Sequence, residues 1–190
     1  MTEDIISNLP DIFRNHICTL RKASLDDSNK CNMCESTLNV IHFDKIPNEY
    51  CRGKGWSSVP KSNDALYICA DGTWYFVEFK NGSIDKSSLF RKLYDSIIML
   101  IDLNIIPDFE FSRNTVNYIL VYNSNKYPTV QESESRTESF SYILRLAHKE
   151  EKLFDVENFE KYLFKETHTY SKEIFESNFV KLMELDEGIA

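Results

Sequence analysis

The stretch DGTWYFVEFKNG, residues 71–82, contains the turn and the strand that decide the expected fold. Asp71-Gly72 separates two short segments, DALYICA (64–70) and TWYFVEF (73–79), which are rich in aromatic and β-branched residues. Such residues suit pleated sheet, so the pattern predicts a β-hairpin. Both faces of both strands are apolar, which is typical of a central hairpin covered on each side. We therefore expect helices on both faces of the sheet.

The hairpin ends in two charged residues, Glu78 and Lys80, which share one face of the strand because side chains alternate. The length of the loop decides whether Asp64 joins them. With a two-residue loop, Asp64 would lie opposite Phe79 and point to the other face. With a three-residue loop that has Gly72 in the left-handed conformation, Asp64 lies opposite Glu78. The second register brings three charged side chains together.

Two opposed carboxylates repel each other, and burial strengthens the repulsion, so such a pair needs a compensating cation. A divalent ion meets this need, since Mg²⁺ is usually held by one or two carboxylates together with water and substrate phosphates. Such an ion can polarise a phosphodiester and activate water, while the ammonium of Lys80 stabilises charge on the phosphate. The pattern therefore favours phosphodiester hydrolysis. The structural alternative is a salt bridge of Glu78 or Asp64 with Lys80 at the open end of the hairpin.

Apolar residues at helical spacing predict two helices, at about 10–22 and 85–104. Asp85 suits the N-cap of the second helix. A short apolar strand at 115–123, reached across this helix, should run parallel to the strand that precedes the helix. Between 31 and 51 the pattern does not distinguish strand from irregular structure. The order helix, strand, strand, helix, strand is typical of a three-layer α/β fold.

The C-terminal part begins with a polar loop at 123–137, and three helical patterns follow at about 138–150, 156–165 and 171–185. We therefore expect a single domain over 1–190 with a C-terminal helical extension over 138–187. The acidic residues of these helices suit a solvated surface or, alternatively, a face that binds a protein partner.

The charged residues of the hairpin form a motif: ND at 63–64, thirteen intervening residues, and EFK at 78–80. With the helix and strand that follow, it resembles the PD-(D/E)xK nuclease superfamily, and Asn63 stands where the name has proline. The resemblance covers about residues 60–122 as a nuclease-like core, and implies a restriction-endonuclease-like fold with a central mixed β-sheet flanked by helices. It implies that Asp64, Glu78 and Lys80 are catalytic, and that Asp64, Glu78 and the Phe79 carbonyl hold Mg²⁺ or Mn²⁺.

Members of this superfamily often add an upstream acid and a base from the helix after the hairpin. The candidate acids are Glu35, Asp44 and Glu49, and the sequence does not choose among them. The candidate bases are Lys86, Arg91 and Lys92, of which we favour Lys92 as a further catalytic residue. His16 could extend the site, but a single histidine on a helix is more typical of a surface or packing residue.

The distribution of charge bears on the substrate. The chain has 190 residues and a net charge of −8, yet residues 52–92 carry seven Lys and Arg against four Asp and Glu. An acidic protein with one basic segment favours a restricted nucleic-acid substrate, DNA or RNA, over any duplex at random. We therefore expect a Mg²⁺- or Mn²⁺-dependent endonuclease, with a defence or toxin enzyme as one option. The alternative is a nuclease-like fold without activity that binds a protein, as an immunity or scaffold module would.

The N-terminus is acidic and no apolar run reaches the length of a membrane span, so we expect a cytoplasmic protein that does not enter a membrane. Five cysteines, an odd number, argue against a disulfide framework. Cys31 and Cys34 form one CxxC pair, and with His42 and Cys51 they have the composition of a structural Zn²⁺ site. A single CxxC pair is a weak motif, so zinc is the less favoured alternative.

Overall fold

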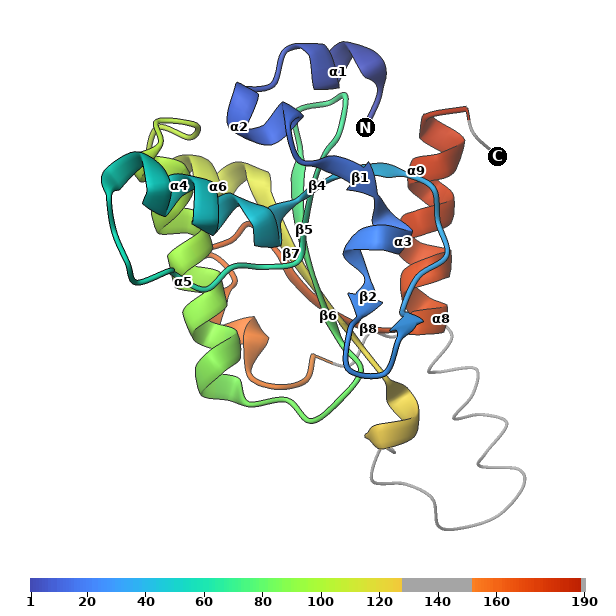
Figure 1. Ribbon diagram of the computed structural model, residues 1–190. Coiled ribbons are helices and arrows are strands. Elements are labelled where there is room, and N and C mark those ends of the chain that lie inside the picture. The colour runs from blue at the N-terminus through green and yellow to red at the C-terminus, as the bar shows by residue number, and fades with distance from the viewer. Residues whose placement is uncertain (128–151, 189–190) are drawn as a thin grey trace, which may run out of the picture.

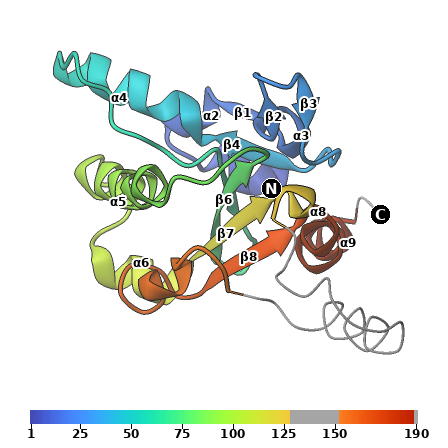
Figure 2. The ribbon, with the colours of Figure 1, turned by 90° about the horizontal axis from the view of Figure 1, so that it is seen from below.

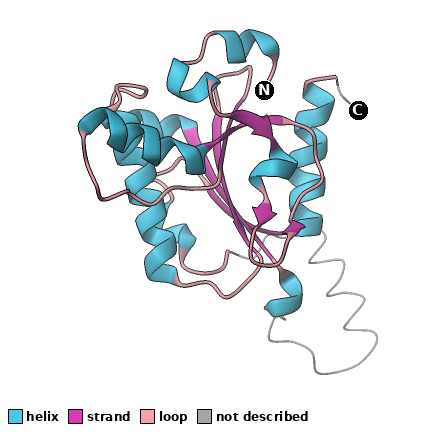
Figure 3. Ribbon diagram, viewed as in Figure 1, coloured by secondary structure: helices cyan, strands magenta, loops and turns pink. Residues whose placement is uncertain are grey.

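The computed structural model describes residues 1–127 and 152–188, which build a six-stranded mixed β-sheet (Figures 1 and 3). In spatial order the strands are β1 (Ile17–Thr19), β4 (Asn39–His42), β5 (Ala65–Ile68), β6 (Trp74–Lys80), β7 (Val116–Tyr122) and β8 (Thr167–Ser171). The first four strands pair antiparallel, and β6, β7 and β8 pair parallel. A separate two-stranded sheet joins β2 (Leu25–Asp26) to β3 (Cys31–Asn32).

Helices lie on both faces of the sheet. Figure 2 shows α5 (Lys86–Asp102) and α6 (Phe109–Thr115) on one side, and α8 (Lys172–Phe175) and α9 (Lys181–Asp186), joined by the π-helical turn η4 (Glu176–Val180), on the other. Aromatic contacts fix both layers: Trp74 packs edge-on against Phe111 of α6, while Phe79 packs against Phe175 of α8. The expected three-layer α/β arrangement with a central mixed sheet is confirmed. Both faces of the central strands are apolar because helices cover both sides of the sheet. No helix within the described residues has the length and apolar character needed to span a membrane.

The central hairpin has the register that places Asp64 opposite Glu78. Ala65 pairs with Val77, and one step beyond this pair Asp64 meets Glu78. The loop contains three residues, and Gly72 in it adopts φ 85°, a left-handed conformation that glycine tolerates without strain. The three-residue loop is therefore confirmed.

The crossover that follows the hairpin is also confirmed. Asp85 caps α5, because its carboxylate accepts hydrogen bonds from the backbone N–H groups of Ser87 and Ser88. The helix buries its apolar stripe, including Leu89 and Leu93, against the sheet. The chain then returns through α6 to β7, which runs parallel to β6 as the helical crossover requires.

The expected helix at 10–22 is wrong. The chain forms α1 (Glu3–Ser7), α2 (Asp11–Arg14), strand β1 and α3 (Leu20–Ala23). Ile17 pairs with Ile41 of β4, so hydrogen bonding to the edge of the sheet outweighs the helical spacing of the apolar residues. The Thr19 hydroxyl then accepts the N–H of Lys22 and begins α3. The undecided region contains β3, β4, the 3-10 turn η1 (Phe43–Lys45) and α4 (Ile46–Lys54).

The C-terminal expectations hold only in part. The expected helix at 138–150 lies outside the described residues. The expected helix at 156–165 is wrong: only the 3-10 turn η3 (Val156–Phe159) forms, because Lys161 has φ 61° and cannot continue a right-handed helix. Strand β8 follows, so this region extends the sheet and is not helical throughout. The expected helix at 171–185 is confirmed as α8, η4 and α9.

Candidate functional site

Asp64 and Glu78 lie where the central hairpin opens, on the face of the sheet that α5 covers. Asp64 precedes β5, and its Oδ2 accepts the backbone N–H of Phe79 at 2.7 Å, which holds the carboxylate across the end of the hairpin. Glu78 lies inside β6 and its side chain is 0% exposed. The backbone register thus brings the two predicted acids to one place.

Two lysines balance the two acids. Lys92, from the second turn of α5, donates from Nζ to Glu78 Oε1 at 2.7 Å, to Glu78 Oε2 at 2.9 Å and to Asp64 Oδ1 at 3.1 Å. Lys80 approaches Glu78 Oε1 with its Nζ at 2.7 Å. All four residues named from the sequence therefore form one cluster. The favoured base is the one that reaches the acids, whereas Lys86 and Arg91 pair with the exposed Asp155 and with Asp95.

Burial sets the electrostatics of the cluster. Burial and the neighbouring Glu78 carboxylate raise the pKa of Asp64 to about 7, although Lys92 and the Phe79 N–H act in the opposite direction. For Lys92, burial alone would lower the pKa, but the Glu78 and Asp64 carboxylates outweigh it and raise the pKa. Lys92 therefore remains an ammonium, while the proton on Asp64 is lost only as the pH rises towards neutrality.

Of the three candidate upstream acids, Asp44 is the one beside the cluster. Its neighbour Phe43 donates a backbone hydrogen bond to the Asp64 carbonyl at 3.0 Å, which brings η1 next to the hairpin. Asp44 and Asp64 line the same pocket, and the Asp44 carboxylate accepts the Ser62 hydroxyl at 2.8 Å. The other two candidates lie elsewhere: Glu35 pairs with Arg21, and Glu49 pairs with His16.

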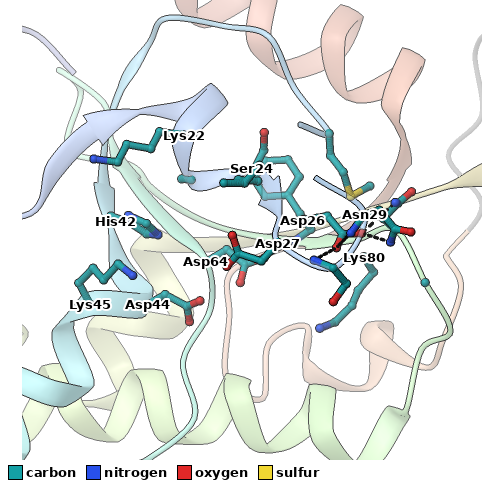
Figure 4. A pocket seen from close by; sticks show the side chains of 17 residues that line it. Lys22, Ser24, Asp26, Asp27, Asn29, His42, Asp44, Lys45, Asp64 and Lys80 are labelled. Atoms are coloured by element: carbon teal, nitrogen blue, oxygen red, sulfur yellow. Dashed lines mark hydrogen bonds between the residues drawn. The ribbon is translucent and has the colours of Figure 1, made fainter. Parts of the chain in front are cut away.

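The pocket has a volume of about 560 Å³, and Figure 4 shows the side chains around it. One wall is the end of β6 with Phe79, Lys80 and Asn81, and the opposite wall is the segment of α3, β2 and the turn after it. Asn81 links the two walls, since its side chain donates to Asp26 Oδ2 at 2.9 Å. The pocket is thus closed on one side by a hairpin that is attached to the end of the central strand.

The sequence did not assign three basic residues of this pocket, Lys22, His42 and Lys45, to the nuclease-like site, and it named His42 only for the zinc alternative. Burial, followed by the charge of Lys45, lowers the pKa of His42. A signal for two of them exists in HFDK, residues 42–45, where polar residues directly follow the apolar end of a strand. Lys22 has no such signal, because only the packing of α3 brings it to the pocket.

The donor set suits a hard divalent cation, because carboxylate and carbonyl oxygens are the ligands that Mg²⁺ and Mn²⁺ prefer. The Lys92 ammonium now occupies the cation position between Asp64 and Glu78, so a metal would compete with it for the same oxygens. Within residues 1–127 and 152–188, no three His, Cys, Asp or Glu side chains are grouped to hold an ion. A metal would therefore depend on water and substrate oxygens for its remaining ligands.

Cys31, Cys51 and His42 of the suggested zinc site each contact a different part of the protein. Cys31 accepts a hydrogen bond from the Asn81 amide at 3.5 Å, and the Cys51 thiol points to the Ser58 carbonyl at 3.4 Å. His42 lines the pocket beside Lys45. All five cysteines are free thiols.

A scan of the chain against protein-family models finds no match, and neither do searches of the curated proteins and of the solved structures. The interpretation of the site therefore depends on its own chemistry.

Proposed function

We propose that the protein is a divalent-metal-dependent nuclease of the PD-(D/E)xK type, with a restriction-endonuclease-like core, that hydrolyses phosphodiester bonds in DNA or RNA. The observation that carries the proposal is the pair of facing carboxylates, Asp64 and Glu78, which two ammonium groups contact next to a pocket that Asp64 and Lys80 line. An isolated buried acid pair is unfavourable, so its presence beside a pocket supports a functional role.

In this proposal Asp64, Glu78 and the Phe79 carbonyl would hold Mg²⁺ or Mn²⁺, and the ion would supply Lewis-acid polarisation of the phosphodiester and activation of water. Lys80 lines the pocket and stabilises negative charge that develops on the phosphate. Lys92 bridges the two carboxylates, and its positive charge offsets part of their mutual repulsion. Asp44 lines the same pocket and accepts a hydrogen bond from the Ser62 hydroxyl, and in this proposal it would orient water beside Asp64.

The experiment is a cleavage assay with labelled single-stranded and duplex DNA and RNA in the presence of Mn²⁺ or Mg²⁺. Wild-type protein should cleave at least one of these substrates, and Glu78→Gln and Lys80→Met should reduce the rate by at least about 100-fold. The matched control is Lys86→Met, which removes an exposed lysine on the same helix as Lys92 and should leave the rate unchanged. If wild-type protein in large excess leaves every substrate uncut, the proposal is wrong.

One observation favours a second function. Lys92 and Lys80 together balance the two carboxylates, so the cluster is electrically complete without a metal, as in an inactive nuclease-like fold that binds a protein partner. A groove lined by Glu35, Glu173, Glu176 and Glu184 between β3 and α8 to α9 would suit a basic partner. Titration calorimetry with Mn²⁺ separates the two functions, because the second one predicts no heat that depends on Asp64 and Glu78.

A further inference from the structure

The pocket has a basic end that the proposed catalytic roles do not use. Lys22, His42 and Lys45 line the same cavity as Asp64 and Lys80. Figure 4 shows these three side chains gathered at one end of the pocket and Lys80 at the other, with Asp44 and Asp64 between them. Each group comes from a different element: α3, the end of β4 and η1.

The Lys22 and Lys45 ammonium groups and the His42 ring have hydrogen-bonding groups that no described acidic residue or hydrogen-bond partner occupies. Among the residues that the structure describes, neither Lys22 nor Lys45 lies within an ion-pair distance of a carboxylate, although the chain carries a net charge of −8. The His42 ring likewise has no hydrogen-bond partner within this part of the chain. Five of the other lysines in the described residues, Lys54, Lys80, Lys86, Lys92 and Lys152, are paired with acids.

The shape of the pocket limits what these donors can bind. A volume of about 560 Å³ falls in the range of sites for small organic molecules, so it admits a short piece of a chain and not the width of a duplex. The Glu78 side chain is fully buried and does not line the pocket, so a phosphate in the pocket approaches the acid pair at Asp64. The β2–β3 segment, which Asn81 attaches to the end of β6, closes one side of the pocket and leaves less room for a second strand.

We propose that the pocket takes a flexible single strand of DNA or RNA and holds two successive phosphates, one at Asp64 and Lys80 and the next at Lys22, His42 and Lys45. This inference rests on the proposed function, and names the substrate class for the same site. Asp44 and Asp64 repel the phosphates of a bound strand. Charge-assisted hydrogen bonds from the Lys22 and Lys45 ammonium groups to the second phosphate offset this repulsion. It also fixes the position of the scissile bond along the strand.

The test is the salt dependence of binding, measured by fluorescence anisotropy with labelled oligothymidylate, oligouridylate and a duplex, in EDTA so that no cleavage occurs. Lys22→Ala and Lys45→Ala should each weaken single-strand binding and reduce the slope of log affinity against log salt concentration by about 0.7. The matched control is Lys181→Ala on α9, outside the pocket, which should leave the slope unchanged. The two single strands show whether DNA or RNA is preferred.

Equal slopes for wild type and the Lys22→Ala/Lys45→Ala variant would overturn the second phosphate site. Duplex binding as tight as single-strand binding, with the same loss in the variant, would overturn the single-strand assignment. Failure of the nuclease is distinguishable: slopes that depend on the two lysines without any cleavage would retain the phosphate site and reject catalysis. Cleavage with unchanged slopes would retain catalysis and reject the second phosphate site. A wild-type protein that neither binds nor cleaves nucleic acid would reject both proposals.

Discussion

Replacement of Lys92 by methionine tests the electrostatic account of the site. The Lys92 side chain is 16% exposed, and its ammonium contacts three oxygens of Asp64 and Glu78. Removal of one partner from a buried ion pair destabilises a protein by about 3–5 kcal/mol. Lys80 still pairs with Glu78, so we expect the lower end, about 3 kcal/mol. For a chain of this size the Tm should fall by about 6–12 °C.

The assay is urea or thermal unfolding of wild type, Lys92→Met and the exposed control Lys86→Met, each with and without Mn²⁺. The control should change the free energy of unfolding by less than about 1 kcal/mol, because Lys86 and Asp155 are about half exposed. Mn²⁺ should stabilise Lys92→Met more than wild type, since the competing ammonium is gone. The double variant Glu78→Gln/Lys92→Met should lose less free energy of unfolding than the sum of the losses in the two single variants. If Lys92→Met lost no more stability than the control, Lys92 would not be compensating the buried acids, contrary to the prediction.

Three further predictions concern the surrounding structure. Burial and Glu78 raise the pKa of Asp64 from 3.8 to about 7, so protonated Asp64 is favoured in the folded state. Its contribution to the free energy of unfolding should be complete below pH about 4 and should fall by about 1.4 kcal/mol per pH unit up to pH about 7. Asp64→Asn should abolish this pH dependence, measured by urea unfolding at several pH values. Gly72 has φ 85°, so Gly72→Ala should destabilise the protein by about 1–2 kcal/mol. Gly53→Ala in α4 should not, because an added Cβ there meets nothing within 4 Å. Equal effects of the two variants in denaturant unfolding would contradict the assigned loop. Tyr118→Phe should be neutral or stabilising in the same measurement, because the buried Tyr118 hydroxyl has no hydrogen-bond partner among the described residues, and a loss above about 1 kcal/mol would contradict this.

The local sequence was sufficient for the hairpin and its crossover. Gly72 permits the left-handed turn, and the loop of three residues fixes which side chains oppose each other up to Asp64. The cap at Asp85 and the apolar stripe of α5 are likewise local features. All three candidate bases lie on this helix, and only the contacts in the structure show that Lys92 reaches the two acids whereas Lys86 and Arg91 do not.

The remaining features depend on contacts between distant segments. Strand β8 consists of THTYS, residues 167–171, and only its parallel pairing with β7 makes this short polar run a strand. The helical spacing of Phe13, Ile17 and Leu20 suited one helix, but Ile17 pairs with β4 at the edge of the sheet. The choice of Asp44 depends on the backbone bond from Phe43 to Asp64, which no local pattern predicts.

The most direct test of the central claim is a crystal structure of the protein grown with Mn²⁺ and examined by anomalous scattering. The account predicts an anomalous peak about 2.0–2.6 Å from the carboxylate oxygens of Asp64 and Glu78, with the Lys92 ammonium displaced from its place between them. Asp64→Asn should remove this peak. A map without an anomalous peak, in which Lys92 still bridges both carboxylates at high Mn²⁺ concentration, would contradict a metal-dependent nuclease.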